Sequence, residues 1–188
     1  MAAPGGTGPI GPYPASVGAD EESRETYDRL RRRVLWSFPS GLFVIGSRHG
    51  DRRNGMTLNW CTQVSFDPKL LAIAVEQAAL THELIAAGGA FAVNVVRRDD
   101  RAIVRKFTKP VDVDAEAHTL NGFGYHDGPA TGAPILDQAA AFVECEVRQR
   151  VECGDHSLFI GEVVKAAFQA DEATEVLRME DTRMNYGG

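Results

Sequence analysis

The sequence predicts a mainly β protein, a closed or nearly closed antiparallel barrel with short flanking helices. First, apolar and polar residues alternate with period two on both sides of Gly154-Asp155, as in two strands joined by a hairpin turn. Second, turn residues separate several more short strand-like segments, which are 42–47, 56–65, 70–76, 91–96 and 175–179. Third, helical periodicity is confined to three brief stretches, which are 20–35, 81–87 and 99–107.

The first two predicted helices carry recognisable end signals. In 20–35, apolar residues recur at i, i+3 and i+7 from Tyr27, and acidic residues fill the first turn, where the helix dipole favours negative charge. In 81–87, Thr81 is the predicted N-cap, and the paired glycines that follow are a common way for a helix to end. We therefore expect both segments to be helices.

Turn residues set the limits of the predicted strands. Turn chemistry at 49–51 follows the strand 42–47, and Asn54-Gly55 supplies a second turn before the strand 56–65. The stretch 108–134 is rich in glycine and proline, so we expect it to be mostly loop.

Length and composition favour one folded domain. The chain has 188 residues, and we expect a tail over 1–20 and a single domain over 21–188. Gly6–Gly11 matches G-x-G-x-x-G, but no strand precedes it and its prolines oppose a helix, so it is not a dinucleotide-binding fingerprint. The net charge of −6 gives little support to nucleic-acid binding. The longest apolar runs are too short for a membrane span, and we expect no secretory signal.

The cysteines indicate neither a disulfide framework nor a metal centre. Cys61, Cys145 and Cys153 are an odd number at irregular spacings, so we expect a reducing, cytoplasmic location. Cys153 could act as a nucleophile with His156 as its base, although two residues on one tight turn would be difficult to aim at each other. A structural zinc site needs four ligands, and no paired C-x-x-C is present, so we predict no metal.

The segment 56–65 is unusually polar for a strand. In a continuous strand, Thr57, Asn59 and Cys61 share one face, and buried polar side chains require partners. The opposite face carries the remaining residues, which are Leu58, Trp60 and Thr62. Either the polar face is solvated, as one face of an antiparallel sheet often is, or a planar polar ligand such as a flavin lies along it.

His156 follows the predicted hairpin turn directly. An imidazole at the mouth of a β-structure can take part in acid–base or polar chemistry near neutral pH. The alternative is a turn residue whose ring is satisfied by the neighbouring backbone. The sequence pattern alone leaves both interpretations open.

Several motifs together resemble those of the flavin reductase-like family, which has the FMN-binding split-barrel fold, a Greek-key antiparallel barrel. The resemblance covers about residues 30–188, and the Gly-Asp-His turn is its most specific part. The motifs occur in order as Gly55-Met56-Thr57-x-Asn59, Ser65-Phe66-Asp67-Pro68-x-Leu70, Phe91-Ala92-Val93-Asn94-Val95, Gly132-Ala133-Pro134-Ile135-Leu136 and Gly154-Asp155-His156-Ser157-Leu158-Phe159-x-Gly161-Glu162-Val163.

The resemblance assigns roles to residues of this chain. His156 is similar to the residue placed near the flavin where the nicotinamide docks, and it is the predicted catalytic residue. The segment 77–82 is similar to a Ser-x-x-Thr loop that contributes to flavin phosphate binding, with Ala78 where a serine is common and Thr81 as the firmer assignment. The predicted flavin-binding residues are Met56, Thr57, Leu58, Asn59, Trp60, Cys61, Thr62, Ala78, Thr81 and His82. The ending Asp181–Gly188 is similar to a tail in one branch of the family.

The resemblance also implies an activity and partners. It implies a homodimer with flavin sites near the subunit interface, and hydride transfer from NADH or NADPH to FMN or FAD. Reduced flavin would then pass to a partner monooxygenase. Two alternatives remain open: a carrier that retains FMN without turning over free flavin, and a flavoenzyme acting on its own small substrate.

Overall fold

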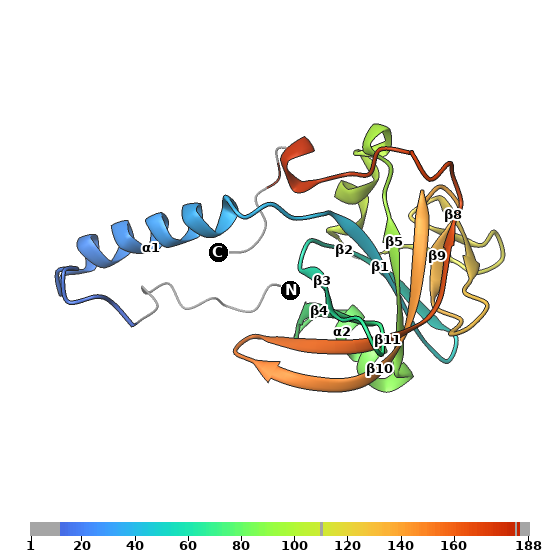
Figure 1. Ribbon diagram of the computed structural model, residues 1–188, viewed down its shortest axis with the longest axis horizontal. Coiled ribbons are helices and arrows are strands. Elements are labelled where there is room, and N and C mark those ends of the chain that lie inside the picture. The colour runs from blue at the N-terminus through green and yellow to red at the C-terminus, as the bar shows by residue number, and fades with distance from the viewer. Residues whose placement is uncertain (1–11, 110, 183, 185–188) are drawn as a thin grey trace. The chain divides into compact units, whose positions relative to one another are not determined.

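The computed structural model describes residues 12–109, 111–182 and 184 (Figure 1). It divides into two compact units, one containing the described residues up to Pro39 and the other running from Ser40 to Thr182. Most of the predicted tail, including Gly6–Gly11, lies outside the described residues, as does most of the ending after Asp181. None of the described helices is long and apolar enough to cross a membrane.

The second unit is built on a seven-stranded antiparallel sheet (Figure 1). Its strand order is β2-β1-β5-β10-β11-β4-β3, so β2 and β3 form the two edges and the pairings do not close the sheet. The prediction of a mainly β, antiparallel protein is confirmed. The strands are β1 (Phe43–His49), β2 (Arg52–Leu58), β3 (Cys61–Ser65), β4 (Leu70–Glu76), β5 (Ala90–Val95), β10 (Ala141–Cys153) and β11 (His156–Phe168).

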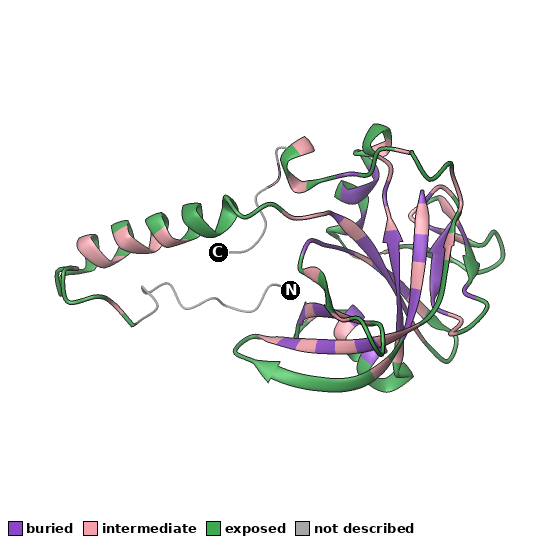
Figure 2. Ribbon diagram, in the orientation of Figure 1, coloured by how far each residue is buried: buried purple, intermediate pink, exposed green. Residues whose placement is uncertain are grey.

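The predicted hairpin is confirmed as the long pair β10–β11. Cys153 pairs with His156 across a turn in which Gly154 has a φ of +62°, a conformation that glycine adopts without steric cost. On β11 the burial alternates with period two, as predicted, but Ser157, Phe159 and Gly161 are the buried set, and Leu158 and Ile160 on the more apolar face are half-buried. Figure 2 shows that the half of β10 nearest the turn is exposed.

Two predictions for the segment after β1 are wrong. Asn54-Gly55 is not a turn but lies inside β2, opposite Ser47 and Gly46 of β1. The segment 56–65 is not one strand, because the chain leaves β2 after Leu58 and enters β3 at Cys61. Asn59 and Trp60 make the connection between the two strands, so the alternation is not continuous through it.

A second, smaller sheet occupies the stretch predicted to be mostly loop. Its strands are too short to show a periodic pattern, and an Asn121-Gly122 turn with positive φ at both residues joins two of them. Turns and irregular segments still make up most of the described residues of 108–134, so the prediction of a mostly loop stretch holds, but the small sheet was not predicted. The strands are β6 (Val113–Asp114), β7 (Thr119–Leu120), β8 (Phe123–Asp127) and β9 (Pro134–Leu136).

Two of the expected elements are confirmed as helices. The first, α1 (Glu21–Trp36), is capped by Asp20, whose carboxylate accepts a hydrogen bond of 2.8 Å from the Ser23 N–H. None of its residues is buried. The second is α2 (Leu80–Gly88), but its N-cap is Ala79, so the prediction of Thr81 as the cap is wrong by two residues.

The remaining predicted elements differ from expectation. The segment 99–107 forms two 3₁₀ helices, η1 (Arg98–Asp100) and η2 (Ile103–Phe107), instead of one helix. The segment 175–179 makes only isolated bridges, at Val176 and Arg178, before the 3₁₀ helix η3 (Met179–Asp181), so the prediction of a last strand there is wrong.

The two faces of the large sheet are covered differently. The α2 face carries the main core, in which Ile73, Phe91 and Phe159 pack with Ile85 of α2. The opposite face is covered over β2 by η2 and over β5 and β10 by the loop and strand at 133–135. Where β4 and β11 cross this opposite face, Leu158 and Ile160 remain only half-buried. This open part of the opposite face is where the candidate site lies.

Candidate flavin site

His156 begins β11 and pairs with Glu76, the last residue of β4. Its Nδ1 lies 2.6 Å from Oδ1 of Asp155, and the imidazole holds the pKa of the Asp155 carboxyl below its usual range through this hydrogen bond. The His156 side chain is 24% exposed, so the ring is accessible but partly packed. The contact engages Nδ1, so Nε2 is the ring nitrogen that a ligand could meet.

Trp60 is the aromatic neighbour of His156. The two ring centroids are 5.0 Å apart with an interplanar angle of 59°. Trp60 is 42% exposed, and its carbonyl accepts a hydrogen bond from the Ala74 N–H of β4, which ties the β2–β3 connection to the sheet. The structure therefore brings together two of the predicted site residues that are 96 positions apart in the chain.

Asn59, next to Trp60, has a buried oxygen without a partner. The residue is 8% exposed, and its Oδ1 makes no hydrogen bond within the part of the chain that the structure describes. Buried polar atoms in folded proteins are nearly always paired, so such an acceptor indicates a missing donor. The N–H of a flavin ring is a donor of this kind, and the residues present therefore fit the group.

The other residues of the predicted ring-lining strand are mostly occupied by the protein itself. The fully buried Thr57 donates a hydrogen bond of 2.5 Å to the Val104 carbonyl of η2, so its face is covered by protein and not by solvent. Leu58 and Met56 pack into the core on the α2 face. Cys61 packs there too, and burial raises the pKa of its thiol to about 12. The prediction that Thr57 and Cys61 share one face of a strand is therefore wrong.

The segment expected to bind phosphate leads into α2. Ala78 is exposed in the turn before the helix, and the Ala79 cap provides no side-chain hydrogen bond to the first turn. Thr81 is fully buried, and its Oγ1 accepts a hydrogen bond of 2.8 Å from the Asn54 amide. This bond ties α2 to β2. The N–H groups of the first turn, not the Thr81 hydroxyl, are the donors that an anion would meet.

Glu83 would oppose an anion at this helix start, but it is paired. Its carboxylate lies 2.5 Å from the Arg52 guanidinium, which holds the pKa of Glu83 below its usual range. The pair removes most of the local negative charge.

Thr62 lies on the opposite face and is exposed on the edge strand β3, as a solvated or ligand-lining residue would be.

His82 makes a contact that the sequence did not indicate. Its Nε2 lies 2.8 Å from Oγ of Ser157, and its ring packs edge-on against Phe159 at 5.1 Å between centroids. Burial, and to a smaller extent the nearby Arg150, lower the pKa of the imidazole. This lowered pKa favours the neutral ring of His82. Its partner Ser157 lies on the α2 face of β11, one residue after His156.

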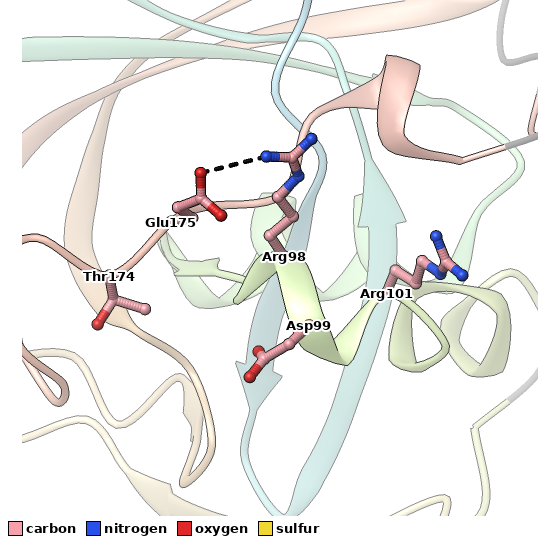
Figure 3. Close-up of a pocket in the computed structure, with 5 residues that line it drawn as sticks. All are labelled: Arg98, Asp99, Arg101, Thr174 and Glu175. Atoms are coloured by element: carbon pink, nitrogen blue, oxygen red, sulfur yellow. Dashed lines mark hydrogen bonds and ion pairs between the residues drawn. The ribbon is translucent and has the colours of Figure 1, made fainter.

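A surface pocket of about 520 Å³ is formed by other residues (Figure 3). It is lined by Arg98, Asp99, Arg101, Thr174 and Glu175. Arg98 is paired with Glu175 at 3.2 Å, so the lining is a mixed charged surface. It contains none of the predicted site residues. In the described ranges, no group of three or more His, Cys, Asp or Glu side chains is arranged to hold a metal ion.

The antiparallel sheet, the histidine after its hairpin turn and the buried, unpartnered Oδ1 of Asn59 fit a flavin-binding class of β protein. Residues 35–188 match the family model of the flavin reductase like domain. The chain therefore belongs to the flavin reductase-like family.

Individual relatives are similar over most of the chain. An NADH-dependent FAD reductase of Streptomyces globisporus is 35% identical over 143 residues, which are 74% of this chain and 76% of the relative. The solved structure of the NADH:FAD oxidoreductase SgcE6 of Streptomyces globisporus C-1027 has a TM-score of 0.72 and 30% identity, covering 94% of this chain and all of that one. The same oxidoreductase has been solved with NAD and FAD fragments.

A third similar protein is BorF, the flavin reductase component of a bacterial two-component tryptophan halogenase. Its TM-score is 0.66 at 31% identity, over 74% of this chain and 86% of BorF. Other curated relatives are longer, and the chain spans 58% of one of them and 21% to 26% of three more.

Proposed function

We propose that this protein is a flavin reductase that uses NADH or NADPH to reduce FMN or FAD. The observation that carries the proposal is the contact between His156 and Trp60 beside the buried, unpartnered Oδ1 of Asn59. The chemistry that a bound flavin supplies is acceptance of a hydride from the nicotinamide. The protein contributes binding and orientation, and none of its side chains has to act as a nucleophile.

The residues divide into three proposed roles. Asn59 accepts a hydrogen bond from the flavin ring, and Thr62 and Trp60 line the same side of the sheet. Met56, Thr57, Leu58 and Cys61 support this segment from the interior. Ala78, Thr81 and His82 belong to the segment that presents the α2 N–H groups to the flavin phosphate. His156 seats the nicotinamide against the flavin, and it is the proposed catalytic residue.

The proposal includes an FMN-binding split-barrel fold over residues 21–188 and a homodimer. The open part of the opposite face supports the homodimer: Trp60 and Val151 are exposed there, and Leu158 and Ile160 are half-buried. A second copy covering these side chains would also enclose His156. We further propose a cytoplasmic location, which the three free cysteines support.

The proposed physiological role is supply of reduced flavin to a partner monooxygenase. The similarity to BorF, a reductase component of a two-component halogenase, supports this role.

Visible spectroscopy and nicotinamide oxidation test the activity directly. The purified protein is mixed with NADH or NADPH, with and without excess FMN or FAD, and absorbance at the nicotinamide band is followed anaerobically. We expect many turnovers of free flavin per protein. If flavin co-purifies with the protein and no nicotinamide is oxidised, the reductase is excluded and an FMN-retaining carrier takes its place. Nicotinamide oxidation that needs a further small substrate would instead favour the independent flavoenzyme.

Thr81→Ala is expected to weaken flavin binding about fivefold to tenfold, because the Asn54–Thr81 bond holds the start of α2 against β2. Loss of the hydroxyl leaves the buried Asn54 amide with one fewer acceptor and loosens the N–H groups that face the phosphate. Flavin fluorescence titration measures the affinity, and Thr81→Ser, which keeps the hydroxyl, is the matched control. A lower melting temperature with unchanged affinity would restrict Thr81 to packing.

A further inference from the structure

The turn that carries His156 is held by two side chains from the segment 77–82. The backbone N–H of Gln77 also donates a hydrogen bond of 2.9 Å to the backbone carbonyl of Asp155. The Gln77 amide Nε2 lies 3.2 Å from the His156 carbonyl and 3.4 Å from the Gly154 carbonyl. On the α2 face, Nε2 of His82 lies 2.8 Å from Oγ of Ser157. We call Gln77 and His82 together the turn clasp.

The turn needs such support because little else fixes it. It lies at the end of the long β10–β11 hairpin, where β10 is exposed from Arg148 to Cys153. The pairing of β11 with β4 begins only at His156 itself, opposite the last residue of β4. An exposed strand end with few buried contacts opens easily, so the position of His156 depends on the contacts made at the turn.

We propose that Gln77 and His82 are positioning residues for the reduction of flavin by nicotinamide, and that they act through His156. The proposal rests on the proposed function, because it assumes that His156 seats the nicotinamide. The clasp fixes the residues before and after the imidazole, while Asp155 fixes the ring itself. A shift of the reacting groups of about 1 Å can cost up to about 100-fold in rate, so loosening this turn has a measurable effect.

The electrostatic surroundings of His82 suit this positional role. The Arg150 guanidinium lowers the pKa of His82 and the Glu152 carboxylate raises it, but burial is the largest influence and lowers it. The lowered pKa favours the neutral ring, whose Nε2 and the Ser157 hydroxyl share one hydrogen bond. A ring nitrogen engaged in this way is better placed to hold the turn than to contact the flavin.

Single and double substitutions test the clasp. Gln77→Ala and His82→Ala are made in the wild-type chain and in a His156→Ala chain, and two quantities are measured. The first is flavin affinity by fluorescence titration, and the second is the rate at which NADH or NADPH reduces saturating flavin in stopped flow. We expect each single variant to reduce saturating flavin about threefold to tenfold more slowly, and Gln77→Ala to keep flavin affinity within about twofold of wild type.

The double variants separate positioning from general structural damage. If the clasp acts through His156, adding Gln77→Ala or His82→Ala to His156→Ala produces no further slowing. His82→Gln, whose amide can still bond to Ser157, is expected to recover most of the rate. Equal slowing in the His156→Ala chain would overturn the proposal, and so would wild-type rates in both single variants.

Two matched controls remove comparable contacts elsewhere. Gln169→Ala removes an amide that bridges the Leu136 and Ala139 carbonyls, and His126→Ala removes a surface ring that contacts Asp137. Both are expected to keep the wild-type rate. If the wild-type chain itself oxidises neither NADH nor NADPH in the presence of flavin, the proposed function fails. If the wild type is active and the clasp variants match it, only the clasp fails.

Discussion

The His156→Ala protein is expected to be reduced by NADH or NADPH about 10- to 100-fold more slowly than wild type, with flavin affinity within about twofold. The reason is geometric. The imidazole is held between Asp155, at 2.6 Å from Nδ1, and the Trp60 ring, at 5.0 Å between centroids. Removing it takes away a contact for the nicotinamide and frees Trp60 to move into the vacated space.

Stopped-flow reduction of saturating flavin, over a range of nicotinamide concentrations, measures this effect. We expect both weaker nicotinamide binding and a lower limiting rate, because a misplaced ring reaches a productive geometry less often. His126→Ala is the matched control, since His126 also contacts an aspartate through Nδ1, at 2.9 Å, on an exposed surface. A His156→Ala protein with wild-type kinetics would reduce His156 to a turn residue and leave the role of Trp60 to be tested alone.

The parts of the fold that the sequence predicted well are those in which one periodic pattern runs through a whole element. The alternation on β11 predicted the strand and its two faces, but the face of Leu158 and Ile160 is only half-buried, and Phe159 on the other face is 1% exposed. Alternation is reliable there because one face packs against the core and the other does not. The limits of β4, Leu70–Glu76, were predicted to the residue because turns bound the apolar run on both sides.

The errors arose where tertiary contacts override local signals. Asn54-Gly55 has the composition of a turn, but Asn54 of β2 pairs with β1 and its side chain bonds to Thr81. Gly55 leaves room for the ring of Phe107. No local residue pattern marks the end of β2 before Asn59. The chain leaves β2 there because it passes from one edge strand of the sheet, β2, to the other edge strand, β3. The small sheet was missed because strands of two to five residues are too short to show periodicity.

The candidate site was predictable only in part. The sequence identified His156 because its motif is contiguous. It did not predict the contacts of His156 with Trp60 and Gln77. Gln77 lies 79 positions away in the sequence, and only strand pairing brings it close. The unpartnered oxygen of Asn59 is likewise a property of burial, which the sequence does not give for a residue between strands.

Glu144→Ala is expected to lower the free energy of unfolding by about 2–4 kcal/mol. Glu144 is fully buried on β10, where its carboxylate accepts hydrogen bonds from the Thr131 N–H at 2.7 Å, the Thr131 hydroxyl at 2.8 Å and the Ala130 N–H at 3.2 Å. Alanine leaves these donors without an acceptor beneath the loop. In a domain of this size, such a loss lowers the melting temperature by about 10 °C.

Glu146→Ala is the matched control, because Glu146 lies two residues along the same strand but is exposed and pairs with Arg148 at 2.9 Å. Surface ion pairs contribute about 0–1 kcal/mol, so this variant should melt close to wild type. Hydrogen exchange gives a second readout, since in Glu144→Ala the amides of Ala130 and Thr131 should exchange faster while those of β11 stay protected. If both variants lose the same small amount of stability, the loop is held by Ala133 and its apolar neighbours, and the buried carboxylate contributes no more than a surface one.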